Sequence, residues 1–171
     1  VWGYERIKEE LPALIPSCKE RSLYDFKRIL REFLSLWGLY ETITFSLTTK
    51  NIAQRLGLQG EGLGLKNPLS QNYSFLRRSI LAGFLEVARL NLYHNNKSLR
   101  FFEIGDIYFQ HQNTIHERAC LGIFMGGQKQ VHWSRKIELF DFFDLKGLLQ
   151  SLFKRLGIRE VLSLIHISEP T

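Results

Sequence analysis

The chain has 171 residues, 44% of them hydrophobic, enough to bury one sizeable core, so we expect one domain with at most a short appendage. Its formal charge of +6 suits a polyanionic partner but is also common in proteins that bind no nucleic acid. The two cysteines lie far apart in the sequence, which argues against a disulfide framework or a zinc site, and no apolar run approaches the roughly 18 residues of a membrane span. We therefore expect a protein of the reducing cytoplasm with no membrane association.

The first predicted elements are a linker and a long helix. Residues 1–16 contain two prolines and no clean period, which predicts an extended linker. Ser17 and Glu20 form a capping box at the start of a helix, and Gly38 can end that helix in the left-handed conformation. One face of the helix carries apolar side chains that either cover the core of the domain or meet a partner: Leu23, Phe26, Leu30, Phe33, Leu34 and Trp37.

A strand, a short helix and a loop follow. Residues 41–47 alternate polar and apolar side chains, the period-2 pattern of a strand with one buried face. Residues 51–56 predict a short helix that Gly57 ends. The glycine-rich loop over residues 57–64 is not expected to bind phosphate, because a P-loop needs Gly-Lys-Ser/Thr at the start of a helix.

A second long helix is predicted after Ser79, whose hydroxyl can cap it. Its apolar residues share one face: Leu81, Phe84, Leu85, Ala88 and Leu92. Five cations in and around this helix, against one acid, give two alternatives, an RNA-facing patch or a solvated helix face: Arg77, Arg78, Arg89, Lys97 and Arg100.

The central element is a buried strand over residues 100–109, rich in aromatic and branched side chains, in which Gly105 predicts a bend or bulge. Residues 111–116 then predict an exposed hairpin loop, and its two histidines lack a third candidate metal ligand. Another apolar strand over residues 119–125 is closed by two glycines. A last helix runs from about residue 140 to Leu156, with Asp141 or Asp144 as its N-cap; capping explains this carboxylate pair better than a metal or acid/base site.

Two of these segments resemble motifs of class II aminoacyl-tRNA synthetases. Residues 102–105, Phe-Glu-Ile-Gly, are similar to the strand that opens motif 2, after which that family has an Arg that grips ATP and the acyl phosphate. Phe109 stands at the position of that Arg, and His111 at the position of the acidic residue two further on. Residues 38–45 resemble motif 1, with Phe45 in place of its proline, and no motif 3 occurs in the sequence.

Other segments are more specific and resemble the phenylalanyl-tRNA synthetase beta subunit. They are Asn-Pro-Leu-Ser at residues 67–70, Leu-Arg-Arg-Ser-Ile-Leu at residues 76–81, Asp-Phe-Phe-Asp-Leu-Lys-Gly at residues 141–147, and Gly-Tyr-Glu-Arg-Ile at residues 3–7. Arg78 and Ala82 depart from the family, which usually has Thr and Pro there. The resemblance covers about residues 2–160.

The resemblance implies an α+β fold with a mostly antiparallel sheet flanked by helices. It implies a cytoplasmic assembly of two alpha and two beta subunits, in which the alpha subunit uses ATP and Mg²⁺ to charge tRNA(Phe) with phenylalanine. This chain would be the synthetase-like module of the beta subunit, at residues 17–162, with no catalytic, cofactor-binding or metal-binding residue. Its long helix would meet the alpha subunit through Phe26, Leu30, Phe33 and Trp37.

Two rival functions stay open on the sequence alone. One is an autonomous class II ligase that binds ATP through a displaced cation such as Arg77 or Arg100. The other is a free-standing tRNA-binding module. Residues 163–171 resemble translated sequencing-adapter read-through, and we expect them not to belong to the native domain.

Overall fold

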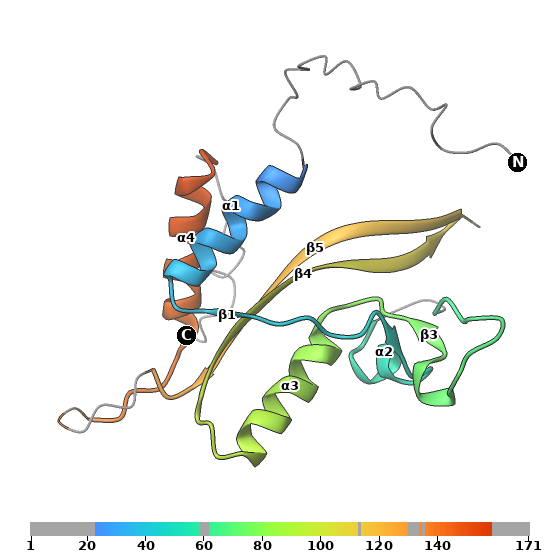
Figure 1. Ribbon diagram of the computed structural model, residues 1–171, viewed down its shortest axis with the longest axis horizontal. Coiled ribbons are helices and arrows are strands. Elements are labelled where there is room, and N and C mark those ends of the chain that lie inside the picture. Colours follow the sequence, from blue (N-terminus) through green and yellow to red (C-terminus); the bar gives the residue numbers. More distant parts are fainter. Residues whose placement is uncertain (1–22, 59–61, 113, 130–133, 135, 159–171) are drawn as a thin grey trace, which may run out of the picture.

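The computed structural model describes residues 23–58, 62–112, 114–129, 134 and 136–158. The expected linker, the capping box at Ser17 and the expected non-native tail lie outside these ranges. A sheet of three strands in the order β1-β4-β5 forms the centre, with α3 on one face and α1 and α4 on the other (Figure 1). A small second sheet, β2-β3, lies beside it with α2 (Figure 1).

The central sheet is dominated by one long hairpin. β4 (Ser98–His111) and β5 (Thr114–Gly127) are antiparallel and pair without interruption along their whole length. The predicted central strand is confirmed and extends further at both ends. Gly105 pairs directly with Cys120 in a one-to-one register, so the strand has no bulge at this position. The predicted exposed hairpin connection within residues 111–116 is confirmed, but it is shorter than predicted, because β4 ends at His111, β5 begins at Thr114, and both histidines lie in the paired strands.

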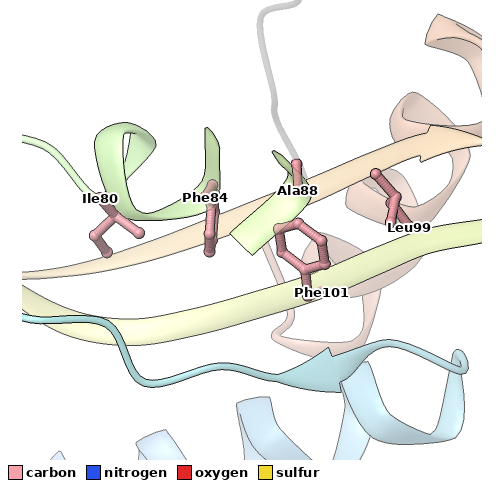
Figure 2. Packing of buried hydrophobic residues seen from close by; sticks show 5 residues of the cluster. All are labelled: Ile80, Phe84, Ala88, Leu99 and Phe101. Atoms are coloured by element: carbon pink, nitrogen blue, oxygen red, sulfur yellow. The ribbon is translucent and has the colours of Figure 1, made fainter. Parts of the chain in front are cut away.

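Alternate residues of β4 belong to two separate cores. Leu99 and Phe101 pack with Ile80, Phe84 and Ala88 on the α3 side, as Figure 2 shows. Since successive side chains of a strand point to opposite faces, Phe102 lies on the other side, where it packs with residues of α1 and α4. Both faces of the sheet are therefore covered near its centre, which explains the continuous apolar run in β4.

The first described helix, α1 (Leu23–Leu36), ends as the sequence predicts. Gly38 has a φ of +78°, its amide donates to Ser35 O at 2.9 Å, and the Leu39 amide donates to Leu34 O at 3.1 Å. This pair of bonds is a Schellman motif, which satisfies the last carbonyls of the helix. The chain then enters β1 (Tyr40–Glu41), parallel to β4.

The predicted single strand over residues 41–47 is wrong. Only its two ends lie in strands, Glu41 in β1 and Leu47 in β2 (Leu47–Thr48), and the residues between them lie in neither. β2 pairs with β3 (Phe75–Leu76) in the small sheet. The face that points outward is also reversed: Ile43 is 92% exposed and Phe45 77% exposed, whereas Thr42 and Thr44 are half-buried. The predicted short helix is confirmed as α2 (Ile52–Arg55), and a 3-10 turn, η2 (Gln71–Tyr73), precedes β3.

A polar side chain accepts a backbone hydrogen bond at the start of each remaining helix, although the N-cap residue of α3 is Ile80 and not the predicted Ser79. The Leu81 amide at the start of α3 (Leu81–Tyr93) donates to Ser79 Oγ at 3.1 Å. Asp141 caps α4 (Phe142–Arg155), because its Oδ1 accepts a hydrogen bond from the Asp144 amide at 3.0 Å. In return, Asp144 Oδ2 accepts a hydrogen bond from the Asp141 amide at 2.8 Å. The predicted capping role of the carboxylate pair is confirmed. None of the described helices combines the length and apolar character that crossing a bilayer requires.

The cap of α4 predicts a pH dependence of stability. The pKa of Asp144 lies below its usual value, first because the Asp141 amide donates to it and second because Lys129 Nζ lies 2.9 Å away. A carboxylate with a depressed folded-state pKa stabilises the fold above its unfolded pKa of about 3.9, and this contribution is lost as pH falls through the folded pKa. Asp144→Asn should lower the free energy of unfolding by about 1 kcal/mol at pH 7.

Urea unfolding measured from pH 7 to pH 2.5 checks this dependence. The difference between wild type and Asp144→Asn should shrink below about pH 4, where the wild-type carboxylate also becomes neutral. Glu86→Gln, which changes an exposed carboxylate on α3, is the control and should follow the wild-type curve. A difference that stays constant with pH would contradict the assignment.

Candidate functional site

The place where motif 2 has its ATP-gripping Arg lies on the far part of the long hairpin, which runs past the end of α3 (Figure 1). Phe109 occupies this place, and its ring stacks on His116 of β5 with centroids 5.4 Å apart. The guanidinium carbon of Arg118 lies 5.0 Å from the centroid of the same ring. Sequence reasoning missed Arg118, and the alternation along β5 was the signal that would have placed it on this face.

The histidines of the hairpin do not make a metal centre. The centroids of the His111 and His116 rings lie 6.4 Å apart, and no third ligand joins them among the described residues. Among the residues that the structure describes, no group of three or more histidine, cysteine or acidic side chains is close enough to hold a metal ion.

The most deeply buried polar cluster joins Arg77 to Glu103. Their side chains are 5% and 4% exposed, and Arg77 Nη1 donates to Glu103 Oε1 at 2.5 Å. Arg77 Nε donates to Asp106 O at 2.9 Å, and Thr44 Oγ1 donates to Glu103 Oε2 at 2.7 Å. A buried charge is tolerated when it is paired and hydrogen-bonded in this way.

Two glycines make room for this cluster. A Cβ on Gly105 would overlap Arg77 Nη2 and lie 2.9 Å from Glu103 Oε1. A Cβ on Gly83 of α3 would lie 2.7 Å from the Cβ of Thr44. The glycine of the Phe-Glu-Ile-Gly run is thus needed because a guanidinium lies across the central strand at that point.

The proposed RNA-facing cations do not form one patch. Arg77 is a correction to that set, because it is buried and bound to Glu103 rather than facing solvent. Arg89 and Lys97 are exposed, and Arg78 is half-buried. Arg100 is half-buried on the face of the sheet opposite α3, with its guanidinium 6.0 Å from the ring of Phe140.

The helix residues expected at a subunit interface divide into two kinds. Leu30 is 5% exposed, and Phe33 is half-buried against the core between the sheet and helices α1 and α4. These two side chains therefore pack inside the domain and not against a partner. Phe26 and Trp37 are 44% and 45% exposed and stay available to a partner.

The structure adds three exposed residues that the sequence reasoning missed. These residues lie a few positions after Trp37 in the chain, and their exposed fractions are 72% for Tyr40, 92% for Ile43 and 77% for Phe45. We call Trp37, Tyr40, Ile43 and Phe45 the apolar edge. The ring of Phe45 lies 5.4 Å from that of Tyr73, which extends this surface to η2. Several large exposed apolar side chains in one short stretch are typical of a surface that a partner covers.

The architecture is shared with solved synthetases. A pyrrolysyl tRNA synthetase from Desulfitobacterium hafniense superposes with a TM-score of 0.59 and 19% identity, over 81% of this chain and 46% of that one. An ATP phosphoribosyltransferase regulatory subunit/histidyl-tRNA synthetase from Bacillus halodurans superposes with a TM-score of 0.59 and 17% identity, over 90% of this chain and 40% of that one. At this level of identity the likeness establishes the class II synthetase fold.

Sequence comparison is more specific. Phenylalanine–tRNA ligase beta subunits from Protochlamydia amoebophila and Legionella pneumophila (strain Paris) are 34% and 31% identical over 94% of this chain. The chain spans 21% of the length of each of these relatives. The model of the phenylalanyl tRNA synthetase beta chain CLM domain matches residues 7–170. The chain therefore belongs to the family of phenylalanyl tRNA synthetase beta chain CLM domains.

Proposed function

We propose that this chain is a non-catalytic module of the beta subunit of phenylalanine–tRNA ligase, and that it supports an alpha subunit in charging tRNA(Phe). ATP and Mg²⁺ would be used by the whole enzyme and not bound by this module. The observation that carries the proposal is Phe109, an aromatic ring where adenylation needs a guanidinium. Negative charge builds on the phosphates in the transition state of that reaction, and a phenyl ring cannot neutralise it.

Neither of the two cations expected to bind ATP in an autonomous ligase is placed to do so. Of the two candidates for a displaced ATP-binding cation, Arg77 is buried and bound to Glu103, and Arg100 is half-buried beside Phe140 on the other face of the sheet. The autonomous ligase is therefore the weaker alternative. The burial of Arg77 and the place of Arg100 on the other face likewise disfavour a free-standing tRNA-binding module, because phosphate contacts gain from several cations on one surface.

The proposed partner would cover the exposed apolar residues of α1 and the apolar edge. An assembly of two alpha and two beta subunits in the cytoplasm, with tRNA(Phe) bound by the whole enzyme, is part of this proposal. Large aromatic side chains are the residues that most often anchor such interfaces.

Association with the alpha subunit tests the proposal. In a complete beta subunit that contains this chain, Phe26→Ser with Trp37→Ser should weaken binding of the alpha subunit by about a hundredfold, because each removes a large apolar contact. Leu90→Ser is the matched control, since Leu90 is 55% exposed on α3, away from α1. Analytical ultracentrifugation of the mixed subunits measures the affinity.

Catalysis gives the second arm of the test. The complete beta subunit without an alpha subunit should show no phenylalanine-dependent exchange between ATP and pyrophosphate. Exchange by the beta subunit alone would refute the non-catalytic assignment. Equal loss of affinity in the Leu90→Ser control would refute the proposed interface.

A further inference from the structure

We propose that Thr44 is a positioning residue that turns Ile43 and Phe45 outward as contacts for the alpha subunit. It does so through the buried pair of Arg77 and Glu103. This inference rests on the proposed function for the identity of the partner, and it deepens that function by naming what sets the shape of the interface.

The segment that carries these contacts crosses between the two sheets. At one end the Thr42 amide donates to Phe102 O of β4 at 2.8 Å, and at the other the Arg77 amide donates to Ser46 O at 2.8 Å. Residues 42–45 are in neither sheet. A stretch without ladder hydrogen bonds depends on side-chain interactions to hold one conformation.

Thr44 supplies that interaction in the middle of the segment. Its Oγ1 donates to Glu103 Oε2 at 2.7 Å and accepts from Arg77 Nη1 at 3.0 Å. Hydrogen bonds to charged groups are stronger than those between neutral groups. On its other side Thr44 packs against Gly83 of α3, and any side chain at position 83 would collide with the threonine. Thr44 is therefore fixed from two directions.

The inward orientation of the Thr44 side chain determines the orientation of the side chains on either side of it. In extended backbone adjacent side chains alternate, so fixing Thr44 inward leaves Ile43 and Phe45 outward, and they are the most exposed members of the apolar edge. The apolar edge begins at Trp37, the residue that follows α1, and so adjoins that helix, whose exposed Phe26 belongs to the proposed interface. Continuity with that surface argues that the same partner, the alpha subunit, covers both.

Two substitutions of Thr44 distinguish the effect of its hydroxyl group from the effect of its side-chain shape. Thr44→Val keeps the volume and removes the hydrogen bonds, while Thr44→Ser keeps the hydroxyl. In a complete beta subunit, Thr44→Val should weaken association with the alpha subunit by about tenfold, and Thr44→Ser should stay within about twofold of wild type. Wild-type affinity in Thr44→Val would overturn the inference.

A double-mutant cycle distinguishes positioning from general loss of stability. In a background where Ile43→Ser and Phe45→Ser have already removed the contacts, Thr44→Val should cause no further loss of affinity. A further tenfold loss in that background would also overturn the inference, because the threonine would then act elsewhere.

A measurement on the beta subunit alone keeps the test independent of the proposed partner. Hydrogen exchange at the amides of Thr42 and Arg77, which close the two ends of the segment, should be faster in Thr44→Val than in Thr44→Ser. If no complex forms with wild type, the proposed function fails, and unchanged exchange would separately refute the anchoring role. Should Thr44→Val not fold, Thr44→Ala, which removes the same hydrogen bonds without burying an extra methyl group beside Glu103, takes its place with the same expected direction.

Discussion

Replacing Arg77 with methionine is expected to lower the free energy of unfolding by about 3–5 kcal/mol, because it leaves the Glu103 carboxylate buried without its counter-charge. The carboxylate is 4% exposed, so water cannot take over the role of the guanidinium. The substitution also removes the donor to Asp106 O and one of the two partners of the Thr44 hydroxyl. Urea denaturation followed by circular dichroism measures the change.

A second substitution tests whether the unpaired charge is the cause. The double variant Arg77→Met with Glu103→Leu should recover at least half of the lost stability, because an apolar pair of similar volume carries no desolvation penalty. If the double variant were as unstable as Arg77→Met alone, the loss would have to come from packing around residue 77 and not from the charge.

Replacing Gly105 with alanine is expected to cost about 3 kcal/mol, although it adds one methyl group to a strand. The methyl would overlap Arg77 Nη2 and press on Glu103 Oε1. An arginine at the surface would swing aside at little cost, but this one is held by Asp106 O and by Glu103 and is 5% exposed. The collision must therefore break hydrogen bonds of a buried cation.

The chain contains a matched control for this change. Gly147 lies in the interior of α4, and a Cβ there would meet nothing within 4 Å. Gly147→Ala should raise stability by about 0.5–1 kcal/mol, because alanine is the better helix former. In the Arg77→Met background Gly105→Ala should cost much less than in wild type. An undiminished cost there would show that the methyl collides with something other than the guanidinium.

Local patterns in the sequence were enough to predict most of the helices and strands. The aromatic and branched run of β4, the left-handed glycine after α1 and the carboxylates before α4 each act through neighbouring residues, so the sequence could place them. Residues 41–47 were misjudged because an alternating pattern says that a strand has two unlike faces and not which one is buried. Here tertiary hydrogen bonds hold the threonines inward and leave the apolar side chains to the surface.

The buried cluster could not be assembled from the sequence, because Thr44, Arg77 and Glu103 come from three distant segments. One signal was present: an acidic residue within a buried strand requires a cation nearby. The sequence offered several cations, and their grouping around one helix suggested a shared surface, which is why Arg77 was assigned to solvent. The role of Phe109 was different, since it depended on a motif within a single strand and could be inferred from the resemblance.

The long hairpin has a consequence for the order in which the chain folds. β4 and β5 are adjacent in sequence, so they pair through local contacts, which form quickly. Pairing of β1 with β4 requires the closure of a large loop and is slower. We therefore expect the hairpin to be formed in the folding transition state and the cluster of Thr44, Arg77 and Glu103 to close after it. Substitutions there should accelerate unfolding and leave the refolding rate nearly unchanged, whereas substitutions along the hairpin should slow refolding.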